Sequence, residues 1–132
     1  MSKLYCTYQG DGQTELVHGL SGAKITTDLP PDNGGKGRFF SPTDLFASSL
    51  AACAITIMGK MAEARGKSLT GTTVEIDKVM ASDPRRVAKI ILKITFAPQV
   101  AAEDKPKYMA SVHSCPVHNS LSKDIEVEFT HN

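Results

Sequence analysis

The sequence predicts a fold of the α+β class, in which one long apolar helix stands along the chain between two sets of antiparallel strands. Residues 41–66 carry the start and stop signals of a helix, short alternating runs precede them, and two longer alternating runs follow. With 132 residues, the chain has the length of one domain and enough sequence for a modest core. We therefore expect a single domain over residues 1–132.

The composition argues against several classes of protein. Lys and Arg together number 15 and Asp and Glu 14, so the charge gives no reason to expect nucleic acid or an acidic membrane surface as a partner. The absence of Trp and an aromatic content of 6% argue against a platform for carbohydrate or single-stranded nucleic acid. Polar residues from Lys3 onward interrupt any apolar signal segment, so we expect a cytoplasmic protein.

The N-terminal part predicts a small antiparallel meander. Residues 3–8, 14–18 and 23–27 have the pattern of short strands, and a Gly-Asp-Gly turn separates the first two. Cys6 lies within the first predicted strand. We interpret it as an ordinary strand residue, because no reactive side chain is near it in the sequence.

Residues 28–40 predict a loop, because their many Pro and Gly residues prevent regular structure. The length of the loop suggests that it covers another part of the molecule. It places Arg38 directly before the central helix. Two interpretations of Arg38 remain open: a solvated cation of the loop, or a cation that faces a site on the helix.

The central segment, residues 41–66, has a complete helix signature. Its signals are Ser41 as the N-cap, Pro42 at the first helical position, Asp44 three residues after the cap, and Gly66 as the stop. From residue 45 to residue 58 there is no charge, and apolar or small residues fall on every side, so we expect a helix that is buried all round. The run is short and rich in Ser and Thr, so a membrane span is the poorer explanation.

The C-terminal half predicts three further strands. Residues 72–81 and 87–96 alternate between apolar and polar side chains and predict a long antiparallel hairpin with one buried face. Residues 125–129 alternate in the same way and predict the last strand.

Two helices are expected between the hairpin and the last strand. The first runs over residues 101–113, and Pro106 is compatible with it only in the first turn. The second is short, opens at Cys115 and Pro116, and has Ser114 as its cap.

The cysteines carry the most specific chemistry in the chain. Three cysteines are an odd number for a reducing compartment, so a reactive pair is a better hypothesis than a disulfide scaffold. At the start of a helix, Cys115 would meet free amide groups that favour the thiolate. Cys53 lies deep within its helix and becomes nucleophilic only if a cation faces it. Arg38 is the leading candidate, because it is the one arginine before the helix.

A peroxide would oxidise a nucleophilic Cys53 to a sulfenic acid, and Cys115 would condense with it to a disulfide. Two alternatives stay open. His113, Cys115 and His118 form an H-x-C-x-x-H pattern that, with Cys53, would supply four zinc ligands. In the other alternative, Cys53 fills the core, and Cys115 opens a helix without any chemistry.

Two segments that contain these cysteines, SPTDLFASSLAAC and HSCPVHNSL, closely resemble the signature stretches of the OsmC/Ohr family of thiol-dependent hydroperoxide reductases. The loop NGGKGRFF before the first segment fits too, and the resemblance covers residues 23–129. It implies an α+β fold in which antiparallel sheets wrap around the paired central helices of an intertwined homodimer. Such a dimer would explain a helix that is apolar on every side.

The resemblance also implies a reaction and its participants. Cys53 is expected to be the peroxidatic cysteine and Cys115 the resolving cysteine of a peroxidase that acts in oxidative-stress defence. The implied substrate is a small organic hydroperoxide, and the implied reductant is a dithiol, either a lipoylated protein or a thioredoxin-like protein. No cofactor and no metal are expected.

The chain departs from the family at one functional position. Active members use an arginine to hold the thiolate and a glutamate, directly after the proline of the first motif, to brace it; here Thr43 stands at that position. The carboxylate of Asp44 comes one residue later, which turns it by about 100° around a helix, and Asp44 also has a sufficient role as the capping partner of Ser41.

With Arg38 and Asp44 as the candidate supporting residues, the sequence lies nearer the less characterised OsmC-like branch than the dedicated hydroperoxide resistance enzymes. The alternative function is therefore a protein that keeps the OsmC-like fold but binds a small molecule or thiol without peroxidase turnover.

Overall fold

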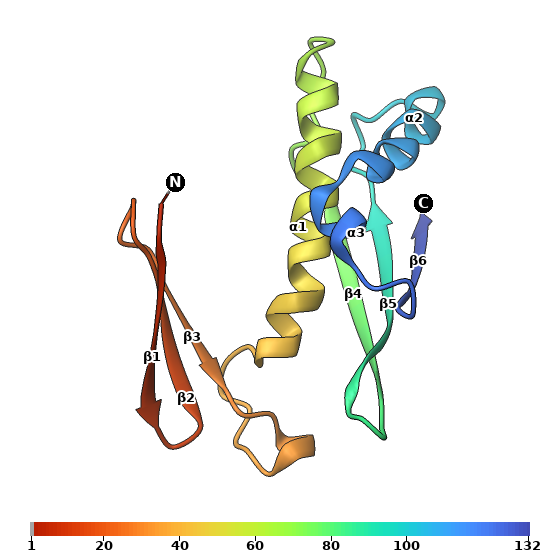
Figure 1. Ribbon diagram of the computed structural model, residues 1–132. Helices are drawn as coiled ribbons and strands as arrows, with labels where there is room; N and C mark the ends of the chain where they lie inside the picture. The colour runs from red at the N-terminus through yellow and green to blue at the C-terminus, as the bar shows by residue number, and fades with distance from the viewer. Residues whose placement is uncertain (1) are drawn as a thin grey trace. The chain divides into compact units, whose positions relative to one another are not determined.

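The computed structural model describes residues 2–132, and its contacts divide the chain into two units, Met1–Phe46 and Ala47–Asn132 (Figure 1). The fold is α+β, with two three-stranded sheets and one long helix. The first unit contains one sheet and the second unit contains the other. Helix α1, Pro42–Glu63, begins in the first unit and continues through the second.

The first sheet is the antiparallel meander that the sequence predicts. Its strands are β1 (Leu4–Gly10), β2 (Gln13–His18) and β3 (Lys24–Asp28), in that order. The turn between β1 and β2 holds Asp11 at φ 54° and Gly12 at φ 76°, a left-handed conformation that Gly adopts freely and Asp tolerates. Cys6 pairs with Leu16 in this sheet and is exposed.

The loop after β3 folds back on its own first residues. It contains one short 3-10 segment, η1 (Pro31–Asn33). The backbone N–H of Gly37 donates to the carbonyl of Leu29 at 3.1 Å. A Cβ at Gly35 would collide with the backbone of Leu29, so glycine is required there. The loop therefore reaches Arg38 along a fixed path.

Helix α1 begins with the predicted capping box. The Ser41 hydroxyl accepts a hydrogen bond from the Asp44 N–H at 3.0 Å, and the Asp44 carboxylate accepts one from the Ser41 N–H at 2.9 Å. The helix ends at Glu63, and the chain turns away at Gly66, whose φ of 69° is left-handed. The predicted start and stop of this helix are confirmed.

The prediction that α1 is buried all round is wrong for the single chain. Its buried residues are Ala47, Leu50, Ala51, Ala54, Met58 and Ala62. They repeat at helical spacing and form one face, whereas Phe46, Ser49, Ala52 and Thr56 are exposed. One sheet and its helices cover one side of a helix only, so the other apolar side stays open within the chain.

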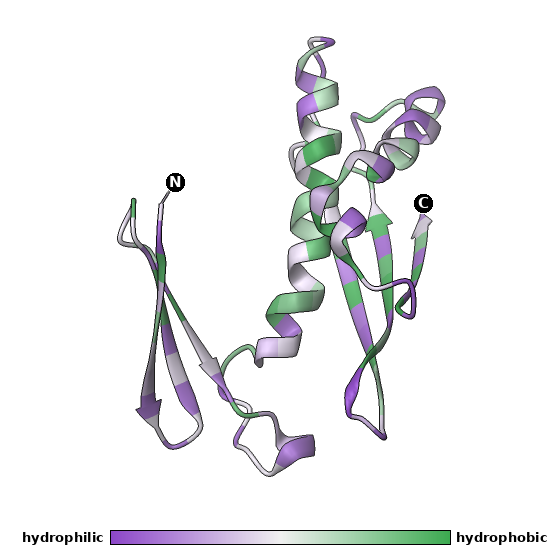
Figure 2. Ribbon diagram, viewed as in Figure 1, coloured by the Kyte–Doolittle hydropathy of each residue, from purple (hydrophilic) through white to green (hydrophobic). Residues whose placement is uncertain are grey.

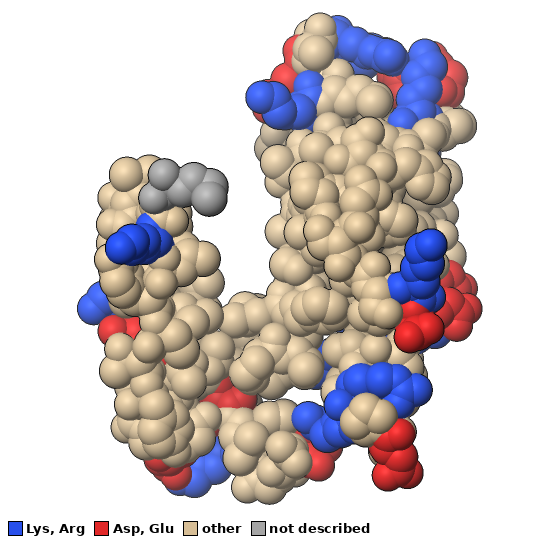
Figure 3. All heavy atoms as spheres, in the orientation of Figure 1, with Lys and Arg blue, Asp and Glu red and all other residues tan. Residues whose placement is uncertain are grey.

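Helix α1 has the length and composition of a membrane span, with a mean hydropathy of 1.6 over 18 residues. The core helix of a soluble protein passes the same test, so this property alone is weak evidence. On the face drawn in Figure 3, uncharged side chains cover the broad central area of the second unit, and charged side chains lie at its ends and along its right edge.

The second sheet combines the predicted hairpin with the C-terminal strand. Strands β4 (Thr73–Ala81) and β5 (Arg86–Thr95) pair in antiparallel fashion, and β6 (Glu126–His131) pairs with β5 in parallel. Hydrophobic and hydrophilic residues alternate along β4 and β5 in Figure 2. The chain can return parallel to β5 because the long connection between β5 and β6 carries it back across the sheet.

The core of the second unit lies between α1 and the buried face of β5. In one cluster, Ala54, Met58 and Ala62 pack with Ile94 and Tyr108. In the other, Leu50 and Ala51 pack with Ile90, Leu92 and Cys115. The alternation that the sequence predicts for β5 is therefore confirmed, and the second cluster brings Cys115 against the helix that carries Cys53.

The helix expected over residues 101–113 is interrupted. The chain forms η2 (Ala102–Asp104), α2 (Lys105–Ala110) and η3 (Ser111–Ser114), and then α3 (Pro116–Ser120). Pro106 occupies the first turn of α2, the one place where the sequence permits it. Pro106 lacks an N–H, which the first turn of a helix does not need, and so it fits directly after the first residue of α2, Lys105.

Candidate active site

Helix α1 and the start of α3 bring two thiols together. Cys53, on α1, is half-buried, and Cys115 is completely buried. Both cysteines are free, and Cys53 packs against the buried cluster that contains Cys115. Both side chains pack in the cluster that contains Leu50, Ile90 and Leu92. The pair therefore lies inside the second unit.

Cys115 caps α3 itself, and Ser114 does not. Ser114 is the last residue of η3, whereas Cys115 has extended dihedral angles and precedes the first helical residue, Pro116. Its sulfur accepts a hydrogen bond from the N–H of His118 at 3.4 Å. The predicted cap was wrong by one residue, because a sulfur in place of a hydroxyl oxygen fills the N-cap position.

The expectation that the helix start favours a Cys115 thiolate is also wrong. Burial raises the pKa of the Cys115 thiol above its ordinary value, and the hydrogen bond and charge of Cys53 raise it further. The N–H groups of His118 and Val117 act in the opposite direction but do not outweigh burial. Cys115 is therefore a protonated thiol at neutral pH, which suits a second thiol better than a first nucleophile.

Two histidines lie near the pair. The rings of His113 and His118 meet edge to face with centroids 6.1 Å apart, and His118 also packs against Phe129. The Nδ1 atom of His118 is buried and has no hydrogen-bond partner among residues 2–132. His118 lines a cavity of about 170 Å³ whose other lining residues are Leu121, Ser122, Lys123, Ile125 and Val127.

The zinc hypothesis is wrong for the described part of the chain. Within residues 2–132, no group of three or more His, Cys, Asp or Glu side chains is arranged to hold a metal ion. The H-x-C-x-x-H pattern crosses the junction of η3 and α3, where Cys115 is turned inward onto α1. A short spacing in the sequence therefore does not produce converging ligands here.

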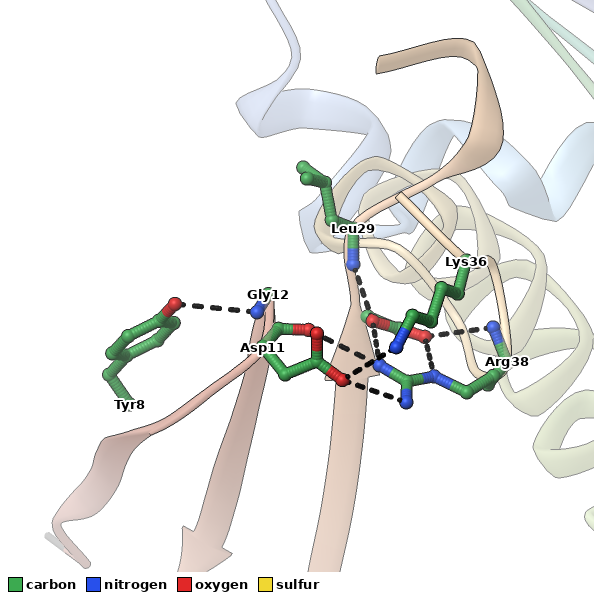
Figure 4. A network of polar contacts seen from close by, with 7 residues as sticks. Tyr8, Asp11, Gly12, Leu29, Lys36 and Arg38 are labelled. Atoms are coloured by element: carbon green, nitrogen blue, oxygen red, sulfur yellow. Dashed lines mark hydrogen bonds and ion pairs between the residues drawn. The ribbon is translucent and has the colours of Figure 1, made fainter. Parts of the chain in front are cut away.

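Arg38, in the first unit, lies in a network of charged side chains (Figure 4). Its Nε donates to Asp28 Oδ2 at 2.7 Å, and Nη2 donates to Asp28 Oδ1 at 3.2 Å. Nη1 donates to Asp11 Oδ2 at 3.1 Å, and Nη2 donates to the Asp11 carbonyl at 3.2 Å. Lys36 Nζ lies 3.0 Å from the same Asp11 oxygen.

Arg38 is exposed on the loop, in line with the simpler interpretation, but it is not unpaired, because the two carboxylates of Asp11 and Asp28 fix its guanidinium. The hydrogen bonds with Asp28, and then those with Asp11, raise the pKa of Arg38 above its already high ordinary value, so it is charged at any working pH. The expected contact of Arg38 with Cys53 stays a prediction.

Asp44 has the structural role that the sequence allowed for it. Its carboxylate caps the Ser41 N–H, so one function of this side chain is to start α1. A catalytic role for Asp44 also stays a prediction.

Sequence reasoning did not identify Asp11 and Asp28 as the partners of Arg38. Asp11 was interpreted as a turn residue and Asp28 as the first residue of a loop. One feature of the sequence could have identified Asp28. It lies at the end of an alternating strand, and a carboxylate there must either face water or pair with a cation.

Comparison with known proteins gives one family. A sequence model of the family described as OsmC-like protein matches residues 35–130. No curated protein matches the chain.

Among solved structures, a protein of Psychrobacter arcticus 273-4 is 42% identical, has a TM-score of 0.94, and matches all of this chain and 96% of its own. Its assignment as an osmotic stress induced and detoxification response protein is provisional. An organic hydroperoxide resistance protein OsmC from Legionella pneumophila (20% identity, TM-score 0.76) matches all of this chain and 96% of its own. The organic hydroperoxide resistance protein OhrB of Bacillus subtilis (16% identity, TM-score 0.70) matches all of this chain and 98% of its own. The similarity to the Legionella pneumophila and Bacillus subtilis proteins shows that this chain shares their fold.

Proposed function

This chain belongs to the OsmC-like protein family, and from that membership and its paired thiols we propose that it is a thiol-dependent peroxidase that reduces organic hydroperoxides. The family includes organic hydroperoxide resistance proteins. The observation that carries the proposal is the packing of Cys53 against the same buried cluster that contains Cys115. Two thiols in contact can store the two electrons that reduction of a peroxide requires.

The reaction proceeds in two steps at these sulfur atoms. The Cys53 thiolate attacks the outer oxygen of the hydroperoxide, the O–O bond breaks, and the alkoxide takes a proton and leaves as an alcohol. Cys53 becomes a sulfenic acid. Cys115 then attacks the Cys53 sulfur, a disulfide forms, and the hydroxyl group leaves as water with the Cys115 proton. A dithiol reductant returns both cysteines to thiols by exchange.

Burial and the pKa of Cys115 support this order of events. Cys53 is half-buried and therefore open to a small substrate, whereas Cys115 is completely buried. The raised pKa keeps Cys115 protonated, so it does not compete for peroxide at neutral pH. Once Cys53 carries a hydroxyl group, attack by Cys115 needs only a local movement.

The proposal assigns Arg38 to the Cys53 thiolate. A thiolate in a partly buried site needs a cation or directed N–H groups, and Arg38 supplies both. Asp44 enters the proposal as the residue that fixes the start of the helix carrying Cys53.

The remaining participants follow from the chemistry and from the exposed apolar surfaces. We propose a homodimer, because the open side of α1 needs an apolar partner. We also propose that the dimer is cytoplasmic. The substrate is a small organic hydroperoxide. The reductant is a dithiol, on a lipoylated protein or a thioredoxin-like protein.

Titration of free thiols after treatment with cumene hydroperoxide tests the proposal. Reduced wild-type protein, with three cysteines, should lose two thiols rapidly and keep Cys6. The Cys53→Ser variant should lose none at that rate, and the Cys115→Ser variant should stop at a sulfenic acid on Cys53, visible as an added oxygen by mass spectrometry. Cys6→Ser is the matched control and should retain the wild-type rate.

A slow reaction of the wild-type protein, at the rate of Cys6 alone, would contradict the peroxidase. The protein would then be better described as a binding protein that kept the fold without turnover.

A further inference from the structure

A second cavity in the second unit has no part in the proposed reaction. It has a volume of about 280 Å³ and lies where the turn after α1 meets the connection between β5 and α2. Its lining includes the polar residues Lys67, Gln99, Asp104 and Tyr108 and the small apolar residues Val100 and Ala101. Tyr108 packs in the cluster that contains Met58 and Ala62, whereas Cys53 and Cys115 pack in the other cluster. The cavity is therefore separate from the paired thiols.

An ion pair lies in the wall of this cavity. Asp104 is 5% exposed, and its Oδ2 accepts a hydrogen bond from Lys67 Nζ. That hydrogen bond lowers the pKa of Asp104 against the opposing effect of burial, and the charges of Lys107 and Arg65 lower it further. The same hydrogen bond raises the pKa of Lys67. Both groups are therefore charged at neutral pH and form a neutral pair with one charge of each sign.

This pair leaves hydrogen-bonding capacity unused. An ammonium has three N–H donors and a carboxylate has two oxygens, and the bond between Lys67 and Asp104 uses one of each. The other Lys67 donors and Asp104 Oδ1 have no hydrogen-bond partner among residues 2–132. Within that range, His118 Nδ1 is the one sealed side-chain polar atom without a partner, so Asp104 Oδ1 meets open space. The open space beside Asp104 is the cavity that it lines.

The hydroxyl group of Tyr108 is unused in the same way. Tyr108 is 2% exposed, and its ring centroid lies 6.1 Å from that of Phe96. A buried tyrosine normally finds a partner for its hydroxyl group, but this hydroxyl has none among residues 2–132 and is not sealed from solvent. It is also close enough to Lys67 to affect the pKa of that ammonium. The hydroxyl therefore meets the cavity near the ion pair.

Hydrogen bonds hold the walls of the cavity in place. The Lys67 N–H donates to the Ala62 carbonyl at 2.9 Å, which fixes the turn after α1. Gln99 Nε2 donates to the carbonyls of Thr70 at 2.8 Å and Ser68 at 3.3 Å, which joins the connection after β5 to that turn. A site that is formed before its ligand arrives loses less conformational freedom on binding.

The unused groups define the chemistry of a ligand. A simple anion would pair with Lys67 but would meet the negative charge of Asp104, and a simple cation would meet the reverse. A zwitterion pairs with both charges. Because Lys67 and Asp104 are in direct contact, the matching ligand carries its two charges close together, as an α-amino acid does with one carbon between them. An ion pair that served the fold alone would not account for the cavity or for the unpaired hydroxyl beside it.

We propose that this cavity binds a free α-amino acid with a small apolar side chain. Lys67 and the Tyr108 hydroxyl donate to the carboxylate of the ligand, and Asp104 Oδ1 accepts from its ammonium. The ligand side chain packs against Val100 and Ala101. A volume of about 280 Å³ is small for a ligand site, which suits a single amino acid better than a peptide. The proposal is independent of the peroxidase reaction, because it uses neither cysteine.

Titration of the reduced, full-length protein with L-leucine tests the proposal, with isothermal calorimetry for the affinity and NMR amide shifts for the location. We expect saturable binding of one molecule per chain, with the largest shifts in segments 67–68 and 99–108. N-acetyl-L-leucine lacks the ammonium and L-leucinamide lacks the carboxylate. Each should bind about tenfold more weakly or worse, because it leaves one charge of the ion pair without a partner.

Two variants test the assigned residues. Tyr108→Phe keeps the ring and removes only the hydroxyl group, so it should weaken L-leucine binding about two- to tenfold, the effect of one hydrogen bond. Lys67→Gln can still donate to Asp104 but has no charge, so it should weaken binding about tenfold or more. The matched control is Lys60→Gln, at an exposed residue of the last turn of α1, and it should bind as the wild type does.

Several results would overturn the proposal. The site does not bind amino acids if neither L-leucine nor the smaller L-alanine and L-valine bind saturably. The zwitterion is the wrong ligand class if N-acetyl-L-leucine binds as tightly as L-leucine. Amide shifts confined to residues 118–127, around the other cavity, would contradict the location. Wild-type affinity in a folded Tyr108→Phe would contradict the assigned contacts, and this variant still decides if Lys67→Gln does not fold.

Discussion

The Cys115 thiol is buried, caps a helix, and touches a second thiol, and these three facts affect its ionisation in different directions. Burial and Cys53 raise its pKa, and two backbone N–H groups lower it. The pKa of Cys115 therefore depends on Cys53 as well as on the burial of Cys115 itself. The state of Cys53 therefore controls how readily Cys115 becomes a nucleophile.

Removal of Cys53 should make Cys115 more acidic. In Cys53→Ala the hydrogen bond and the negative charge that raise the pKa of Cys115 are gone, while the N–H groups of His118 and Val117 remain. We expect the pKa of Cys115 to fall relative to the wild type but to stay above the ordinary thiol value, because burial persists. Ultraviolet thiolate absorbance during a pH titration, in a Cys6→Ser background, measures it; an unchanged or higher pKa would contradict the contact.

Asp28 should make the protein sensitive to acid. Its pKa is lowered from 3.8 to about 2 in the folded state, so the unfolded state binds the proton first as the pH falls. The stabilisation is complete above about pH 4 and is lost as the pH approaches 2. Urea unfolding between pH 6 and 2.5 should show a steeper loss of free energy of unfolding in the wild type than in Asp28→Asn. Parallel curves would count against the pairing with Arg38.

The sequence predicted the cysteine pair and missed the carboxylates that hold Arg38, for a physical reason. Cys53 and Cys115 stand out through residue type and position. Asp28 is ten residues from Arg38 along a Gly- and Pro-rich loop, and local sequence does not say where such a loop returns. For the same reason, the relation of Arg38 to Cys53 stays a prediction.

Among the secondary-structure elements, α1 shows how a local signal can specify structure without tertiary information. Its capping box forms because both partners, Ser41 and Asp44, lie within four residues of each other. The parallel placement of β6 and the interruption of the helix after residue 101 depend on distant contacts and were not predicted. Local chemistry thus defines where elements begin, and long-range packing decides how they pair.

Removal of the cap should destabilise α1. Ser41→Ala leaves the Asp44 N–H without its acceptor in a buried position, and loss of an N-cap typically costs about 1 kcal/mol in the free energy of unfolding. Ser48→Ala, the same change within the helix, is the matched control and should be neutral or slightly stabilising. Urea denaturation at fixed protein concentration measures both, and equal effects of the two would contradict the role of the cap.

Substitutions on the two faces of strand β5 should change the free energy of unfolding by very different amounts. Leu92 is fully buried against α1, so Leu92→Ala should reduce the free energy of unfolding by about 2–5 kcal/mol through lost burial and a cavity. Lys93, the next residue, is exposed, and Lys93→Ala should change it by less than about 0.5 kcal/mol. The same denaturation experiment compares them, and similar values would mean that the alternation along β5 does not determine its packing.

Considered as a whole, the chain has a hydrophobic core in only one of its units. Every buried hydrophobic residue of the described chain lies at or after Ala47. Among residues 2–46 the buried side chains are polar, and Leu4, Tyr8 and Leu20 are 74%, 70% and 83% exposed. A three-stranded sheet without a covered apolar face is not stable alone. The first unit therefore needs a covering surface.

A second copy of the chain is the covering surface that we expect, and it would also cover the open side of α1. Ala52 lies in that open stripe, so Ala52→Glu places a charge where two apolar surfaces would meet. Analytical ultracentrifugation should find the wild type as a dimer, and Ala52→Glu as a species that dissociates at much higher protein concentration. Ser82→Glu, in the exposed turn between β4 and β5, adds the same charge and should leave the dimer intact. A monomeric wild type at every concentration would mean that the first unit is stabilised in another way, and would remove the dimer from the proposed function while leaving the thiol pair in place.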